Sequence, residues 1–189
     1  MTHALYLLDP NPAPAWAPFA GARPLCELRA GAHLIRERWE TFVGAETAAI
    51  FALPHLAGFA EAGVPLVAAR RPVPGPAVIG SSTFAPRGLA PALPDGAFRL
   101  TSGAVTVGWG VGPGATWDGP QPHAAAIEVP GVVLHGTYDL VPALELGFFS
   151  SDFVKHFTSR AGHPRRPEWL CDRWEWNSPP FSCSSWSRS

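Results

Sequence analysis

The stretch Ala32-His-Leu-Ile-Arg-Glu-Arg-Trp-Glu-Thr-Phe-Val43 carries the clearest helical pattern of the 189-residue chain. Its apolar residues recur at i, i+1, i+5, i+8 and i+9, which places them on one stripe of an amphipathic helix. These apolar residues are Leu34, Ile35, Trp39, Phe42 and Val43, and the charged residues Arg36, Glu37, Arg38 and Glu40 lie mostly on the opposite side. We therefore predict a helix over residues 32–43.

Short apolar runs on both sides of this helix are typical of buried strands. They cover residues 4–8, 48–53, 64–69 and 76–80. Five prolines between Pro10 and Pro24 make that segment an irregular connection, and Pro54 suits the start of a short helix that ends near Gly63. This alternation predicts an α/β layered sheet, with ligands bound beyond the carboxyl ends of the strands.

The second half of the chain changes character. Residues 98–101 and 104–109 flank Gly103 and predict a hairpin that extends the sheet antiparallel. Further strands are expected at 124–129 and 132–134, and a helix from Asp139 to about Phe157, with Asp139 as a plausible N-cap. Residues 159–189 are rich in Trp, Ser and Arg without a regular period, so we expect a poorly structured tail there.

Composition narrows the classes of function. The net charge of −1 gives no field that would attract nucleic acid. No apolar stretch reaches the ~20 residues that span a bilayer, and the first residues do not resemble a signal peptide, so we expect a cytoplasmic protein without a membrane partner. Cys26, Cys171 and Cys183 lack CxxC spacing, which favours buried thiols over disulfides or a closed zinc site.

Several weaker patterns favour a structural interpretation. The alternating glycines of residues 108–114 resemble a phosphate loop, but no helix start follows them, so a strand edge or loop is expected. Residues 80–83 hold hydroxyls without the G-x-S-x-G of a serine hydrolase. The seven histidines show no metal-binding spacing, and Asp118, Asp139 and Asp152 are expected to serve turns or caps.

One longer motif points to a family. Residues 22–39 contain Arg23-Pro24, Leu28-Arg29, Gly31 and Arg38-Trp39 in a strand, loop and helix context. This pattern resembles the start of a bacterial family of sugar nucleotidyltransferases. Fainter likenesses follow at residues 77–86 and 137–140, so the resemblance covers about residues 3–158 and places the domain at 1–158.

The resemblance implies a Rossmann-like, three-layer nucleotidyltransferase-type sheet. Members of the family are similar to the amino-terminal half of bifunctional proteins, which pair a UDP-N-acetylglucosamine diphosphorylase with a β-helical glucosamine-1-phosphate acetyltransferase. The hexapeptide repeats of a β-helix are not found in these 189 residues, so only the nucleotidyltransferase half is expected. The implied partners are a nucleoside triphosphate and a hexose or hexosamine 1-phosphate, in cell-envelope sugar metabolism.

The same resemblance implies roles for individual residues. Arg23 stands where the wider superfamily has the lysine of a Lys-Pro pair, and its guanidinium would act catalytically as a phosphate fork. Arg29 and Gly31 would bind substrate beside the start of the helix. Gly80 and Ser81 stand at the strand end that normally supplies substrate contacts and a Mg²⁺ ligand. For Arg23 and Arg29 the alternative is a structural role, as loop anchors or ion pairs with Glu27 or Asp9.

Two departures from the superfamily pattern concern catalysis. The glycine-rich loop expected after the first strand is replaced by Asp9-Pro-Asn-Pro-Ala-Pro14, which has fewer free N–H groups for phosphates. The strand-end aspartate that binds Mg²⁺ is replaced by Ser81, a poorer ligand, so Mg²⁺ is expected only together with a nucleotide. A non-catalytic domain that binds a sugar nucleotide or docks a β-helix partner is therefore the alternative function.

Overall fold

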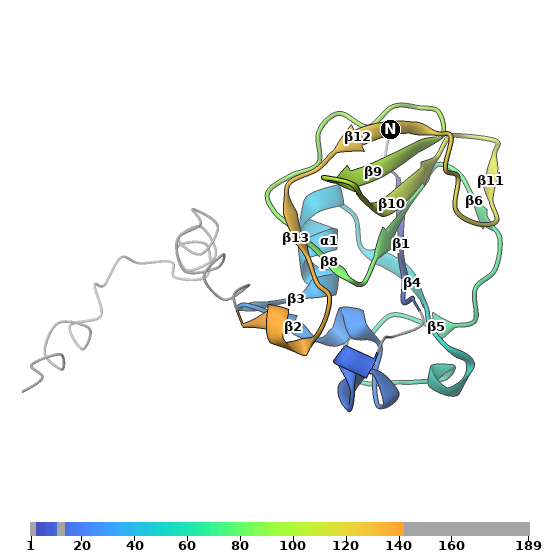
Figure 1. Cartoon of the computed structure of the whole chain (residues 1–189). Helices are drawn as coiled ribbons and strands as arrows, with labels where there is room; N and C mark the ends of the chain where they lie inside the picture. The colour runs from blue at the N-terminus through green and yellow to red at the C-terminus, as the bar shows by residue number, and fades with distance from the viewer. Residues whose placement is uncertain (1–2, 11–13, 142–189) are drawn as a thin grey trace, which may run out of the picture. The chain divides into compact units, whose positions relative to one another are not determined.

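A seven-stranded mixed sheet forms the centre of the protein in a computed structural model that describes residues 3–10 and 14–141 (Figure 1). In spatial order its strands are β12 (Ala125–Glu128), β9 (Phe98–Ser102), β10 (Val105–Val111), β7 (Ala77–Ser81), β1 (Ala4–Leu8), β4 (Thr47–Phe51) and β5 (Val67–Ala68). The α/β sheet predicted from the sequence is confirmed, and it is consistent with a Rossmann-like nucleotidyltransferase-type fold.

Six of the seven strands run in the same direction. β1 pairs in parallel with β4 and β7, β4 with β5, and β9 with β12. β10 runs antiparallel to both of its neighbours, β7 and β9. The predicted hairpin of β9 and β10 is thus confirmed, and it extends the sheet as expected.

The helix α1 (Ile35–Val43) begins three residues later than predicted. Residues 33 and 34 instead form β3 (His33–Leu34), which pairs with β2 (Arg29–Ala30) in a small hairpin. The first turn of α1 is closed by Glu37, whose Oε2 accepts the N–H of Leu34 at 2.9 Å. Gly44 ends the helix with a φ of 75° and donates its N–H to the Glu40 carbonyl at 2.8 Å.

Alternation along the strands divides the core between the two faces of the sheet. On one face, Leu5 and Leu7 of β1 pack with the apolar stripe of α1, namely Ile35, Trp39 and Phe42. On the other face, Phe51 and Ile79 are covered by a two-stranded ribbon. The ribbon is β6 (Val73–Pro74) paired with β11 (Thr116–Trp117), and Val73 and Trp117 are its buried side chains. The sheet therefore lies between a helical layer and a β-ribbon (Figure 1).

Several connections are more irregular than the sequence predicted. The proline-rich segment after β1 contains the 3-10 turns Pro14–Trp16, Phe19–Gly21 and Leu25–Glu27. The short helix expected from Pro54 to Gly63 is only the 3-10 turn Pro54–Leu56. Pro54 fixes the start of a turn, but the following glycines at 58 and 63 both have positive φ, which ends any helix.

Towards the end of the described residues, β13 (Gly131–Val133) pairs with β8 (Phe84–Pro86) beside α1. The helix predicted to start at Asp139 is replaced over Thr137–Leu140 by a 3-10 turn. Asp139 does act as a local cap, since its Oδ2 accepts the N–H of His135 at 2.6 Å. The rest of that helix, the boundary at 158 and the tail 159–189 lie outside the described residues. Within the described part, no helix is long and apolar enough to cross a membrane.

Candidate functional site: an arginine pocket at the carboxyl edge of the sheet

The order of the strands reverses beside β1. After β1 the chain adds β4 and β5 on one side, and then returns to place β7 on the other side. Ligands of open α/β sheets bind beyond the carboxyl ends of the strands at such a reversal. The connections that follow β1 and β4 meet there around a pocket of about 420 Å³. Its lining residues are Phe19, Arg23, Glu27, Leu28, Arg29, Leu34, Arg36, Glu61, Ala62 and Val64, and we call it the arginine pocket.

Asp9 ties one wall of the arginine pocket to the end of β1. Its Oδ2 accepts the N–H of Leu25 at 2.8 Å, two residues before Glu27 of the pocket. Burial raises the pKa of Asp9 to about 6, although the Ser82 hydroxyl and the N–H groups of Leu25 and Cys26 oppose this shift. Asp9 Oδ1 and the hydroxyl oxygen of Ser82 are both buried, and neither has a hydrogen-bond partner among the described residues.

Cys26 lies beside this carboxylate and is completely buried. Its pKa is raised well above the ordinary value, first by burial and then by the charges of Asp9 and Glu27. A thiol in these surroundings stays protonated and unreactive. The predicted buried thiol is confirmed for Cys26, while Cys171 and Cys183 lie outside the described residues.

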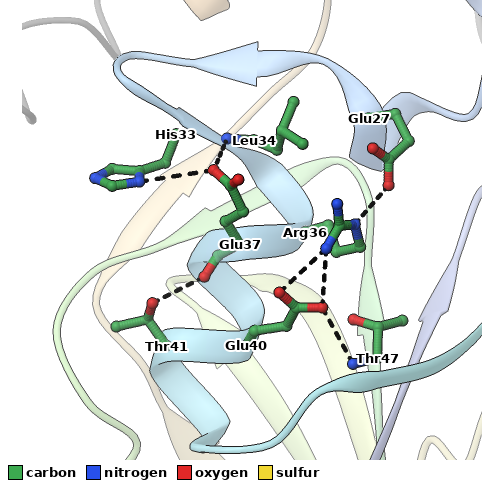
Figure 2. Close-up of polar contacts among 8 residues, drawn as sticks. All are labelled: Glu27, His33, Leu34, Arg36, Glu37, Glu40, Thr41 and Thr47. Atoms are coloured by element: carbon green, nitrogen blue, oxygen red, sulfur yellow. Dashed lines mark hydrogen bonds and ion pairs between the residues drawn. The ribbon is translucent and has the colours of Figure 1, made fainter. Parts of the chain in front are cut away.

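Arg36 links the pocket to α1 and β4. Its Nε donates to Glu27 Oε1 at 2.6 Å and its Nη1 to Glu40 Oε1 at 3.1 Å, while Glu40 Oε1 also accepts the Thr47 N–H. Figure 2 shows the guanidinium held between the two carboxylates. Burial alone would lower the pKa of Arg36, but Glu27 and Glu40 outweigh it and raise the pKa above its ordinary value. Arg36 is therefore a fixed, fully charged structural cation.

The other two arginines of the pocket differ in how they are paired. Arg23 Nη2 donates to Glu61 Oε1 at 2.8 Å, and both side chains are exposed. Arg29 Nη1 donates to the Ala32 carbonyl at 2.8 Å and has no carboxylate partner among the described residues. Neither arginine forms the ion pair with Glu27 or Asp9 that the structural alternative named. The hydrogen bonds that they do form join loop segments, as that alternative also expected: Arg29 bonds within the turn between β2 and β3, and Arg23 bonds to the connection after β4. The structure brings Arg23 and Arg29 together in one pocket.

The remaining predicted site residues do not line this pocket. Gly31 forms the turn between β2 and β3 with a φ of 79°, a conformation that favours glycine. Ser81 ends β7, and its hydroxyl lies 2.8 Å from that of Thr83. Gly80 lies under α1, where an added Cβ would be 2.6 Å from Cε2 of Trp39. Its missing side chain thus makes room for the helix.

The described residues contain no group of three or more His, Cys, Asp or Glu side chains that would hold a metal ion. The carboxylate nearest the reversal, Asp9, turns inward to Leu25, and the Ser81 hydroxyl contacts Thr83. These donors do not fit a preformed Mg²⁺ site. Of the alternating glycines, Gly108 and Gly110 lie within β10, and Gly112 and Gly114 lie in the loop that follows it. The expected strand and loop are thus found over residues 108–114, although β10 is an inner strand of the sheet.

Arg36, Phe19 and Glu61 line the pocket but were not predicted as site residues. Arg36 was assigned to the solvent side of the helix, although its spacing from Glu40, i to i+4, already indicated an ion pair. Phe19 lies in the proline-rich connection, and Glu61 lies 38 residues after its partner Arg23. Neither shows a local pattern, so no sequence signal would have found them.

Comparison with known proteins adds one result. Residues 5–95 match the family model described as sugar nucleotidyl transferase, which is just under half of the chain. The matched segment runs from β1 past β7 and includes every residue that lines the arginine pocket. No curated protein and no solved structure was found to match the chain. The family match and the sheet support a sugar nucleotidyltransferase-like family.

Proposed function

We propose that this chain is a cytoplasmic sugar nucleotidyltransferase, similar to UDP-N-acetylglucosamine diphosphorylase. It would transfer a nucleotidyl group from a nucleoside triphosphate to a hexose or hexosamine 1-phosphate. The observation that carries the proposal is the arginine pocket, which lies at the strand reversal and within the segment that matches the family. In that pocket Arg29 is a cation without a carboxylate partner among the described residues, which suits a phosphate.

The chemistry needs positioning and charge neutralisation. A phosphate oxygen of the sugar 1-phosphate attacks the α-phosphorus of the triphosphate, a new P–O bond forms, and the bond to pyrophosphate breaks. Negative charge grows on the leaving pyrophosphate, where fixed cations lower the barrier. Arg29, and Arg23 once it is released from Glu61, would supply guanidinium donors for these oxygens.

The alternative, a non-catalytic domain that binds a sugar nucleotide or docks a β-helix partner, also has a specific observation in its favour. Asp9, the carboxylate at the end of β1, is used inside the fold, and Pro10 follows it without an N–H group. Release of pyrophosphate from a nucleoside triphosphate, dependent on both Mg²⁺ and a sugar 1-phosphate, separates the two functions. Binding without release would favour the non-catalytic domain.

The arginine substitutions test the phosphate site. Arg29→Ala should weaken UTP binding by about 1.5–3 kcal/mol, which is the contribution of a hydrogen bond to a charged group. Arg23→Ala should weaken it by the same amount or less, because the ligand must first displace Glu61 from Arg23. Arg23→Lys should recover only part of the loss, since the bidentate fork is gone. Calorimetric titration gives the affinities and thermal unfolding the stabilities. A lower melting temperature with unchanged affinity would assign either arginine to the fold alone.

Magnesium binding should depend on the nucleotide. Because the described donors form no metal cluster and Ser81 contacts Thr83, titration of the free protein with Mg²⁺ should be nearly silent. Addition of UTP should produce an Mg²⁺-dependent binding signal, because the triphosphate brings most of the oxygen ligands of the ion. A micromolar Mg²⁺ site in the absence of nucleotide would contradict this expectation.

A further inference from the structure

The charges of the arginine pocket are balanced unequally. Three guanidinium groups, Arg23, Arg29 and Arg36, face two carboxylates of the pocket lining, Glu27 and Glu61. Arg36 is paired with two carboxylates, Glu27 and Glu40 of α1. Arg29 is held only through a backbone carbonyl, so its remaining N–H groups are available to a ligand. Arg29 is therefore the cation of the pocket that can bind an anion without first leaving a carboxylate.

The two ion pairs of the pocket differ in burial. The side chains of Arg36 and Glu27 are 12% and 4% exposed, whereas those of Arg23 and Glu61 are 38% and 47% exposed. Breaking a buried pair leaves a desolvated charge and is strongly unfavourable, but an exposed pair contributes little and exchanges readily. A ligand anion can thus replace Glu61 on Arg23, and it cannot replace Glu27 on Arg36.

An aromatic side chain completes the pocket. Phe19 lines it and is 50% exposed, although it is large and apolar. Ala62 and Val64 add apolar surface next to Glu61. A ring attached to the phosphate, whether a base or a sugar, would cover this surface, whereas inorganic pyrophosphate would not.

We propose that Glu61 is an internal counter-ion that an incoming phosphate ester displaces from Arg23, while Arg29 binds the phosphate and Phe19 supports the ring. This inference rests on the proposed function, because it concerns the same pocket and the same class of ligand. Glu61 keeps Arg23 extended towards the pocket when no ligand is bound. A ligand without an anionic group does not compete with Glu61 for Arg23, so the pair favours phosphate esters by a small factor.

The experiment compares Glu61→Gln with wild type, by calorimetric titration with pyrophosphate and with UTP. Removal of the competing charge should tighten binding of both ligands about two- to five-fold, since an exposed ion pair is worth only this much. Glu46→Gln is the matched control: it changes the net charge equally, but Glu46 is exposed beyond the other end of α1, just before β4. The control should leave both affinities nearly unchanged.

Phe19→Ala tests the ring contact. It should weaken UTP binding about five-fold or more, in line with base stacking on aromatic side chains, and leave pyrophosphate binding unchanged. Thermal unfolding of each variant verifies that it is folded. Equal effects of the two glutamate variants, or weaker binding in Glu61→Gln, would overturn the role of Glu61 but leave the proposed function intact. Absence of binding in both wild type and Glu61→Gln would overturn the inference and the proposed function together.

Discussion

Replacing Asp9 with asparagine should stabilise the protein at pH 8 by up to about 3 kcal/mol. The reason is that burial raises the pKa of Asp9 from 3.8 to about 6, and each pKa unit corresponds to about 1.4 kcal/mol of stability. A carboxyl group with a raised pKa favours the folded state while it is protonated. That stability is complete below pH 4 and is lost as the pH rises through 6. The amide of the Asp9→Asn variant keeps an acceptor for the Leu25 N–H and carries no charge, so this variant should not lose stability over the same range.

The measurement is urea unfolding of wild type and Asp9→Asn between pH 4 and pH 8. The difference between the two should be small at pH 4 and reach its full size above pH 6. Asp95→Asn serves as the control, because Asp95 is exposed and its variant should follow the wild-type curve. A constant difference at all pH values would show that the pKa of Asp9 is the same in the folded and unfolded states. A less stable Asp9→Asn at pH 8 would show that the fold favours the charged carboxylate.

The parts of the fold that the sequence predicted are those with a strong local pattern. The strand at residues 4–8 matches β1 because its apolar run is bounded by Asp9 and Pro10. The helix over 32–43 ends where predicted but starts at Ile35, because pairing of β2 with β3 takes up the residues before it. Periodicity alone does not include such pairing. The second face of the sheet also escaped prediction, since two-residue strands such as β6 and β11 carry no period.

In the candidate site, too, the residues that a local pattern predicted differ from those that only the folded chain brings together. Arg23 and Arg29 were identified through a motif, and both line the arginine pocket. Glu61 comes from a connection after β4, and only the folded chain brings it within 2.8 Å of Arg23. Gly80 was assigned to substrate binding on the resemblance, yet its immediate neighbour is Trp39 of α1. A glycine required by a distant side chain looks, in the sequence, the same as a glycine required by a ligand.

Trp39 and Gly80 should behave as one unit in a double-mutant cycle. Trp39 is completely buried, and its indole N–H donates to the Ser81 and Phe84 carbonyls at 3.1 Å each, so the ring cannot move aside. Trp39→Ala should lower the free energy of unfolding by about 3–5 kcal/mol, because it leaves a cavity in the core. Gly80→Ala should cost about 1–3 kcal/mol in the wild type, because the new Cβ would overlap three ring atoms at 2.6–2.9 Å.

The sign of the second substitution should reverse once the ring is gone. Alanine is intrinsically better than glycine within a strand by roughly 0.5–1 kcal/mol, and its methyl group would fill part of the cavity in Trp39→Ala. Gly80→Ala should therefore be neutral or stabilising in that background, which gives a coupling energy of about 1–4 kcal/mol by urea unfolding. Gly96→Ala is the control, since nothing lies within 4 Å of its added Cβ, and it should be additive with Trp39→Ala. If Trp39→Ala does not fold, Trp39→Leu replaces it in the cycle. Additive losses of stability at positions 39 and 80 would mean that Gly80 does not serve the packing of α1. The predicted role of Gly80 in substrate binding would then be the explanation of the glycine.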